Sequence, residues 1–280
     1  MANIRLAREQ GLIFNTLKID NKTATDIFLL SVDRDATPSL LYNNFVVPKR
    51  NGSQSFNNKY DDRYITVSIG IYAVNASDRR IKQRQLLNRI INFDSKLTFL
   101  DQPQLFYKAK VFDAVDVKED EVFTILSITF KCSFCMYEYS NDLNDLLVNQ
   151  LLMSVDDITV LVNSLEWLNI KTTTNKTIIN NGNYNSLPII YLRPNTNCSS
   201  ITITINNEKF TIVNLNAGED IFIDSEKMIV YKLVNNQKVS ILDRFTGNFL
   251  SLEAGVNEIL ITGTNFAVNM EINYKNTYLY

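Results

Sequence analysis

The segment 228–262 restricts the possible folds of this chain more than any other part of the sequence. It reads MIVYKLVNNQKVSILDRFTGNFLSLEAGVNEILIT, in which an alternating stretch leads to Asn235-Asn236, then to a Thr-Gly-Asn turn, then to Ala-Gly before another apolar stretch. Turn residues at such short and regular intervals are typical of an antiparallel β-sandwich. No Ser, Cys or carboxylate in it is arranged as in a catalytic site. We therefore expect this region to fold and to bind, and not to carry out a reaction.

The length and the composition of the chain are typical of a globular protein. The 280 residues are enough for two domains or one large one, and 45% hydrophobic with 21% charged residues is a common composition for a folded chain. Asn is abundant, whereas Gly numbers 8 and Pro 5. Because Asn tolerates the left-handed backbone conformation better than other non-glycine residues, we expect it to form many of the turns.

The absence of histidine and the balanced charge exclude several classes of function. The sequence contains 0 His, and His is the usual general base near neutral pH and the commonest metal ligand. Ser-His-Asp and Cys-His catalysis and most zinc sites are therefore excluded. A formal net charge of −2 gives no basic field, so specific binding to nucleic acid or to an anionic membrane surface is not expected. We predict no catalytic residue, no cofactor and no metal.

The three cysteines do not form a convincing redox or metal motif. Cys132 and Cys135 have CxxC spacing, but the segment 121–136 alternates like a strand, in which residues three apart point to opposite faces. Neither a second CxxC nor a histidine is present to complete a metal site, and Cys198 stands alone. We expect packed, reduced thiols and folding in a reducing compartment.

The ends and the apolar stretches of the chain predict no export or membrane insertion. The first residues, MANIRLAREQGLIF, carry scattered charges and lack the apolar core of a signal peptide. No apolar run approaches the roughly 18 residues that a membrane span requires. We expect the chain to be made and to fold in a cytoplasm.

The N-terminal half predicts strands and one helix. Strands are expected at 25–32, from 44, at 63–73, 97–100, 104–112 and 122–134, and the polar run 53–62 is expected to be a long loop. A helix should begin at 75–78 with Ser77 or Asp78 as N-cap and run to about 92, with Leu86, Leu87, Ile90 and Ile91 as its apolar stripe. Its basic residues are more consistent with a solvated face than with nucleic-acid binding, because no aromatic residues are interleaved with them; they are Arg79, Arg80, Lys82, Arg84 and Arg89.

Acidic residues cluster at 113–121 between two predicted strands. Clustered carboxylates can bind calcium, but the EF-hand spacing and its turn glycine are absent. A solvated hairpin loop is the preferred interpretation.

The remaining chain divides into a connector and an all-β region. Leucines recur at helical spacing after Ser140, 158–168 is ambiguous between helix and strand, and Trp167 is expected to be a packed anchor. From 172 onward short strands alternate with turns. The predicted organisation is an N-terminal domain at 1–140, a partly helical connector at 141–168 and a β-sandwich at 169–280. The fold class is mainly β, with an α+β N-terminal domain built on a β-sandwich or split barrel with one helix.

The order of these features resembles the distal tail protein family of siphoviral phages. The N-terminal half contributes Lys-Arg-Asn-Gly at 49–52, Tyr-Asp-Asp-Arg at 60–63, Asp-Gln-Pro at 101–103 and Tyr-Lys-Ala-Lys-Val at 107–111. The C-terminal half contributes Asn-Gly-Asn at 181–183, Leu-Pro-Ile-Ile at 187–190 and the segment 247–257. Each motif alone is weak, and their order and spacing carry the resemblance. The leucine-rich connector is longer than the family usually has.

The resemblance implies a structural protein of the virion tail tip. In the family, the N-terminal domain assembles into a hexameric ring that continues the tail tube, and a C-terminal domain similar to galectins projects outward. The expected partners are identical copies, the tail tube protein, the hub or tail-associated protein and receptor-binding proteins, with DNA passing through the lumen. Because basic walls would retain DNA, part of the 113–121 cluster is expected to face the lumen. The loop 53–62 and the hairpin around 113–121 are the candidate ring contacts.

Two other functions are left open by the residues. A carbohydrate-binding adhesion module could stack sugars on tyrosines; the candidates are Tyr184, Tyr191, Tyr274, Tyr278 and Tyr280. Against this function, galectin-type sugar sites resemble a His-containing motif, and this chain has no His. A glycosidase would require paired carboxylates in one cleft; the candidates are Glu219, Asp220, Glu253 and Glu258.

Overall fold

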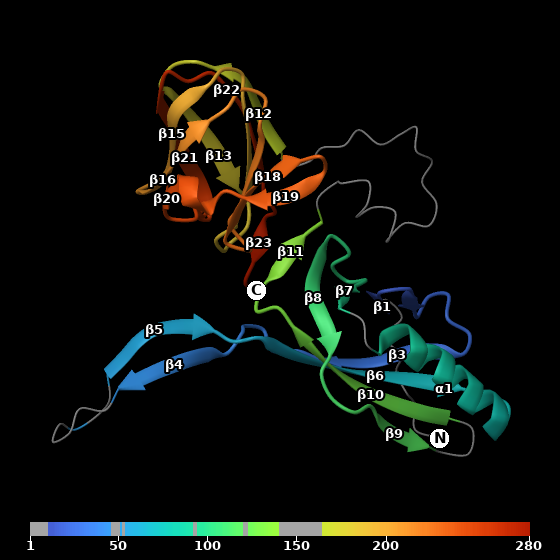
Figure 1. Ribbon diagram of the computed structural model, residues 1–280. Helices are drawn as coiled ribbons and strands as arrows, with labels where there is room; N and C mark the ends of the chain where they lie inside the picture. Colours follow the sequence, from blue (N-terminus) through green and yellow to red (C-terminus); the bar gives the residue numbers. More distant parts are fainter. Residues whose placement is uncertain (1–10, 46–50, 52–53, 92–93, 120–122, 140–163) are drawn as a thin grey trace. The chain divides into compact units, whose positions relative to one another are not determined.

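Two compact units make up the chain. The computed structural model describes residues 11–45, 51, 54–91, 94–119, 123–139 and 164–280 (Figure 1). Unit 1 comprises residues 1–137 and 279–280, and unit 2 comprises 138–278. Strands dominate the described residues of both units, which confirms the mainly-β fold class expected from the sequence.

Unit 1 is built on one large antiparallel sheet in the order β2-β1-β7-β8-β10-β6-β3, with β9 paired to β10. Its strands are β1 (Gly11–Phe14), β2 (Leu17–Asp20), β3 (Ile27–Asp33), β6 (Arg63–Tyr72), β7 (Ser95–Phe99), β8 (Leu105–Val111), β9 (Asp116–Glu119), β10 (Phe123–Cys132) and β11 (Met136–Glu138), the last of which ends beyond the boundary of the unit. The sheet curls, because β2 and β3 at the two ends of this order lie close together. Asn21, directly after β2, exchanges two hydrogen bonds of 2.8 Å with the backbone of Leu29 in β3.

The core of unit 1 follows from strict alternation along β6 and β10. Ile65, Val67, Ile69 and Ile71 are all buried on one face of β6, as the sequence predicted. Residues of β10 alternate in the same way, and the two strands pair over their full length, from Phe123 opposite Tyr72 to Cys132 opposite Arg63.

The α-helix of unit 1, α1 (Ala76–Ile90), lies where the sequence placed it but differs in two details. The N-cap is Asn75, whose side chain accepts a hydrogen bond of 2.8 Å from the backbone N–H of Asp78, so the prediction of Ser77 or Asp78 was wrong. Leu86 and Ile90 bury the apolar stripe, but Arg79 is buried with them and lies 3.7 Å from Glu119. Arg79 therefore does not belong to a solvated basic face.

Two further predictions for unit 1 were wrong. Most of the expected loop at 53–62 is strand β5 (Gln54–Tyr60), which pairs with β4 (Leu40–Phe45) as a separate two-stranded sheet. The sequence of this strand, QSFNNKY, lacks the hydrophobic alternation from which the other strands were predicted. Cys135 lies in a bend beyond the end of β10, so the two CxxC thiols do not share a strand; both are buried.

Unit 2 is a two-sheet β-sandwich. One sheet has the order β12-β22-β14-β17-β18-β19 and the other the order β13-β21-β15-β16-β20. The elements are β12 (Ser164–Ile170), β13 (Thr174–Asn180), β14 (Ile189–Pro194), β15 (Cys198–Ile205), β16 (Glu208–Leu215), β17 (Asp220–Asp224), β18 (Ile229–Val234), β19 (Gln237–Ser240), the 3-10 turn η2 (Leu242–Arg244), β20 (Phe245–Gly247), β21 (Gly255–Thr264), β22 (Val268–Asn273) and β23 (Thr277–Tyr278). The expected helix after Ser140 lies outside the described residues, and β12 begins within the range expected to be connector.

One apolar cluster fills unit 2 between its sheets. Ile203, Phe210, Ile223, Ile261 and Ile272 are among its fully buried members, and Trp167 packs against it, which confirms the anchor role expected of this residue. Among the described residues, eight non-glycine residues have a positive φ and seven are Asn: Asn15, Asn169, Asn206, Asn214, Asn235, Asn236 and Asn265. The inference that Asn forms the turns is confirmed.

Candidate assembly surfaces

The β4–β5 ribbon exposes large apolar side chains. Leu40, Leu41, Tyr42 and Phe45 are between 40% and 60% exposed, and no β4 residue is buried. Exposed neighbours on one strand cover both of its faces, because successive side chains point in opposite directions. Contiguous exposed apolar surface of this kind marks an interaction site in a soluble protein. The ribbon is therefore the strongest candidate contact in unit 1 (Figure 1).

A buried arginine fixes the base of this ribbon. The guanidinium of Arg63, which is 5% exposed, donates to the carbonyl oxygens of Phe134 at 2.9 Å and Asp35 at 2.8 Å, and also to those of Ala36 and Leu279. Asp35 and Ala36 lie between β3 and the ribbon. No carboxylate pairs with Arg63 in the part of the chain that the structure describes. Backbone carbonyls, together with the ring of Tyr107 at 5.9 Å, compensate its buried charge.

The acidic segment 113–121 is a strand over part of its length. The whole of β9 is exposed, and it pairs with β10 from Asp116 opposite Ser127 to Glu119 opposite Thr124. Val117, on the same strand, is 41% exposed. A strand with one unpaired edge can add a further strand from another chain, so β9 is a second candidate contact.

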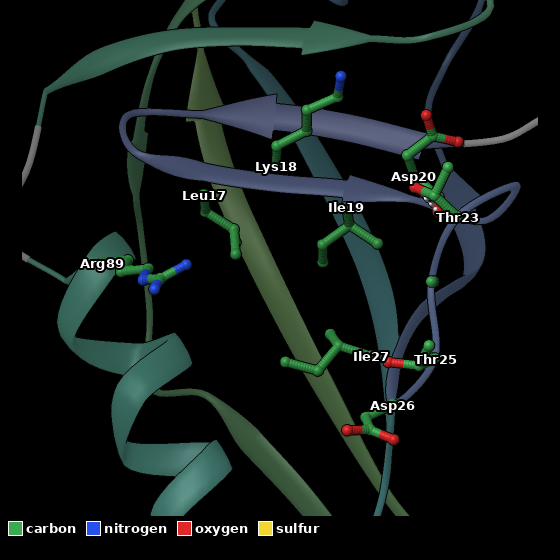
Figure 2. A pocket seen from close by; sticks show the side chains of 10 residues that line it. Leu17, Lys18, Ile19, Asp20, Thr23, Thr25, Asp26, Ile27 and Arg89 are labelled. Carbon is green, nitrogen blue, oxygen red and sulfur yellow. Dashed lines mark hydrogen bonds between the residues drawn. The ribbon is translucent and has the colours of Figure 1, made fainter. Parts of the chain in front are cut away.

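A groove opens beside the seam between β2 and β3. It has a volume of about 410 Å³, and its lining includes Leu17 and Ile19 of β2, Ile27 of β3 and Arg89 of α1. Figure 2 shows these four side chains pointing into the same space, whereas Lys18 points away from it. The groove therefore has an apolar floor with a cation at one side.

Hydrogen bonds hold the walls of the groove in place. The side chain of Asn15 donates to the carbonyl oxygen of Arg89 at 3.1 Å, which ties the β1–β2 turn to the end of α1. Lys82 of α1 lies 3.1 Å from Asp26 and 2.9 Å from Asp78. Hydrogen bonds with these two carboxylates raise the pKa of Lys82, so the link remains charged at neutral pH. The groove is thus preformed.

On the outer face of unit 2, the candidate carboxylates are engaged in structural pairs. Glu219 contacts Lys232 at 2.7 Å and Arg244 at 3.3 Å. Burial alone would raise the pKa of Glu219, but hydrogen bonds from Lys232 and Asn216 outweigh it and lower the pKa to about 2. A carboxylate with so low a pKa is a poor general acid at neutral pH.

The other three carboxylates proposed for a glycosidase do not complete a catalytic pair with Glu219. Asp220 accepts a hydrogen bond of 2.5 Å from the hydroxyl of Tyr191 and lies 3.7 Å from Arg193. Glu258 is an exposed residue of β21, and Glu253 lies in the turn before this strand, where its backbone N–H is bound by Asn257. None of these contacts joins two carboxylates in one cleft.

The tyrosines proposed for sugar stacking take different roles. Burial is the largest cause that raises the pKa of Tyr191 to about 12, and the hydrogen bond with Asp220 raises it further. The hydroxyl therefore stays protonated and acts as a hydrogen-bond donor. Tyr274 packs against the core and donates to the carbonyl oxygen of Ile179 at 2.8 Å. Tyr184 forms a bridge to Thr277, Tyr278 lies in β23 and Tyr280 is the last residue of the sequence.

Within the described residues, no group of three His, Cys, Asp or Glu side chains is placed to bind a metal ion. Burial raises the pKa of the Cys132 thiol to about 12, so this thiol is not a reactive nucleophile. None of the helices in the described ranges has the length and apolar character needed to cross a bilayer.

Comparisons with known proteins cover both units. Residues 18–132 match the model of the phage tail protein RIFT-related domain, and residues 181–278 match that of the siphovirus-type tail component, C-terminal domain. The chain belongs to the siphoviral distal tail protein family. It is a structural component of the phage tail tip, and its place is in the virion.

One solved structure agrees with this assignment at the level of the fold. The crystal structure of the Dit protein of phage SPP1, described as a hub of the adsorption apparatus in phages that infect Gram-positive bacteria, has a TM-score of 0.66 at 12% identity. The match covers 95% of this chain and 98% of that one. A structure of the phage P2 baseplate with Ca covers 94% and 97% at 9% identity, with a TM-score of 0.45. A search of curated protein sequences gives no significant match.

The sequence predicted the family and named 53–62 and the hairpin around 113–121 as ring contacts, but it revealed neither the groove nor the apolar strand of the ribbon. The groove was missed because it joins residues from β2, β3 and α1 that are separated in the sequence. The sequence prediction assigned the ribbon partly to a strand that begins at 44 and partly to a loop at 53–62. The run Leu-Leu-Tyr at 40–42, with no polar alternation, was a signal that could have revealed it.

Proposed function

We propose that this distal tail protein forms a closed, six-fold ring that joins the tail tube to the hub or tail-associated protein. Unit 1 builds the ring, and unit 2 carries baseplate or receptor-binding parts. DNA passes through the lumen, and part of the 113–121 segment lines it. The protein is not an enzyme, and it assembles in the host cytoplasm.

The observation that carries the proposal is the exposed β4–β5 ribbon. A monomer gains nothing from four large apolar side chains in water, and an unpaired two-stranded sheet is marginal by itself. Contact with an identical neighbour would cover this surface. When the same contact repeats around a rotation axis, a head-to-tail interface closes into a ring.

The test is the assembly state of the purified full chain. Native mass spectrometry and negative-stain microscopy should show a closed ring of six copies, and a chain in which 41–59 is replaced by an Asn-Gly turn should stay monomeric. A chain with Ile179→Ser and Val256→Ser is the matched control, because these two residues are also exposed, apolar and opposite each other in a strand pair. Rings that persist without the ribbon would refute its role, and a monomer at high concentration would refute the ring.

A second test addresses β9. Val117→Lys adds a charge to its exposed surface without removing a buried group. If β9 forms a ring contact, the ring should dissociate at higher protein concentration in this variant than in the wild type. An unchanged concentration would exclude β9 from the interface.

An adhesion module that binds saccharides is the alternative function. Tyr191, Phe222 and Tyr231 form a row across β14, β17 and β18, on the face opposite the core. However, the rings of Phe222 and Tyr231 stack on each other at 5.2 Å, and Lys238 lies over Tyr231 at 4.5 Å. A sugar needs a free ring face, so the row is better suited to supporting the sheet. Saturable binding on a glycan array would favour adhesion.

A further inference from the structure

We infer that the groove beside β2 and β3 is the socket that receives Tyr42 of the β4–β5 ribbon from a second copy of the chain. This inference rests on the proposed ring and adds to it the receiving surface and the inserted residue. The partner is defined by chemistry, as an uncharged strand that carries an exposed aromatic side chain.

The first argument is the position of the two surfaces on one strand. Ile27 at the start of β3 lines the groove, and Asp33 at the end of β3 leads to the ribbon. Seven residues in extended conformation separate the two surfaces by roughly 20 Å. Groove and ribbon thus lie at opposite ends of one rigid strand pair, β3–β6. A head-to-tail contact requires this arrangement, because each copy must present a donor on one side and an acceptor on the other.

The second argument is the match in polarity. The segment LLYNNF of β4 has no charged residue, and Tyr42, at 60%, is its most exposed large apolar side chain. The floor of the groove is apolar, and its charged lining residues are Lys18, Arg89, Asp20 and Asp26, of which the Lys18 side chain points away from the groove. A neutral strand therefore adds no charge to the groove when it enters.

The third argument is Arg89. Its guanidinium points into the groove, and none of the residues in the described ranges forms an ion pair or hydrogen bond with it. A planar cation in this position stacks well on an aromatic ring. Tyr42 supplies such a ring, and its hydroxyl can remain at the polar rim. Aromatic anchors that enter a preformed pocket commonly carry most of the binding energy of an interface.

Site-specific crosslinking tests the pairing directly. In a chain with Asn44→Cys and Thr25→Cys, a short bis-maleimide should link copies into a ladder that ends at the closed ring. Asn44 lies two residues after Tyr42 on β4, so the inserted ring is kept, and Thr25 is an exposed residue of the groove. The natural cysteines Cys132, Cys135 and Cys198 are buried and should not react. Asn44→Cys with Lys110→Cys is the matched control, since Lys110 is exposed on β8, away from the groove, and no ladder is expected.

A blocking variant supplies an independent readout. Thr25→Trp fills the mouth of the groove without removing a buried side chain, and it should weaken assembly by about 30-fold. Lys110→Trp adds the same bulk elsewhere and should leave assembly unchanged, and both variants should keep the wild-type melting temperature. Rings that form without the Asn44–Thr25 crosslink and tolerate Thr25→Trp would overturn the socket but leave the ring intact. Failure of the unmodified chain to form rings would overturn both.

Discussion

Unit 2 and the β4–β5 ribbon are both made of antiparallel strands, yet they use apolar residues in opposite ways. In unit 2, two sheets face each other, and each strand sends alternate side chains into the shared core. In the ribbon, Leu40, Leu41 and Tyr42 follow one another without alternation, and all three are exposed. Hydrophobic residues on strands stabilise the fold only where a facing layer removes them from water. Elsewhere they are available to a partner.

The sharpest way to test this contrast is to truncate one aromatic residue in each region. Phe210 is fully buried, so Phe210→Ala should lower the free energy of unfolding by about 3–5 kcal/mol through lost burial and a cavity. Phe45→Ala in the ribbon should change it by about 0.5 kcal/mol or less. Urea denaturation of the monomer measures both values. Equal losses would show that the ribbon is part of the core.

Arg63 offers a second test of this contrast, because it is a buried polar residue of unit 1 that holds the base of the ribbon. Arg63→Met should lower the free energy of unfolding by about 3 kcal/mol, since carbonyl oxygens from three chain segments lose their donor. Arg84→Met, on the exposed face of α1, should cost about 0.5 kcal/mol or less. If the two variants unfold alike in urea, the guanidinium does not organise these segments.

The acid sensitivity of unit 2 gives a third comparison. The pKa of Glu219 is lowered from 4.5 to about 2 in the folded state, so its stabilising contribution is complete above the unfolded pKa and is lost as the pH falls through the folded pKa. Up to about 3 kcal/mol should disappear between about pH 4.5 and 2. The Glu219→Gln variant should lack this part of the pH dependence. Parallel wild-type and variant curves from denaturation at each pH would contradict it.

The smallest expected effect is at the turn between β18 and β19. Asn236 has φ +61°, so Asn236→Ala should cost about 1 kcal/mol, because alanine adopts the left-handed region with more strain. Asn236→Gly should be neutral or slightly stabilising by the same reasoning. Melting temperatures of the two variants rank them. A turn that tolerates alanine as well as glycine would mean that the backbone changes conformation there.

Local patterns in the sequence determined most of the sandwich strands, the strands β3, β6, β8 and β10, and the position of α1, because burial on one face imposes a period that is readable without coordinates. The high Asn content also predicted which residue type forms many of the turns, since the left-handed conformation is a property of single residues. The prediction was wrong where tertiary contacts replaced local preference. Arg79 is buried beside Glu119, and the strand β5 has a polar sequence and pairs with β4 in a separate two-stranded sheet.

Only the tertiary structure decided which surfaces are available to a partner. The groove exists because the sheet of unit 1 curls until β2 and β3 approach each other, and α1 closes one side of it. Whether Leu41 or Tyr42 is exposed depends on which other segments pack against β4, and the residues of β4 cannot specify that. Secondary structure follows from the chain's own periodicity, whereas exposure depends on residues that are distant in sequence.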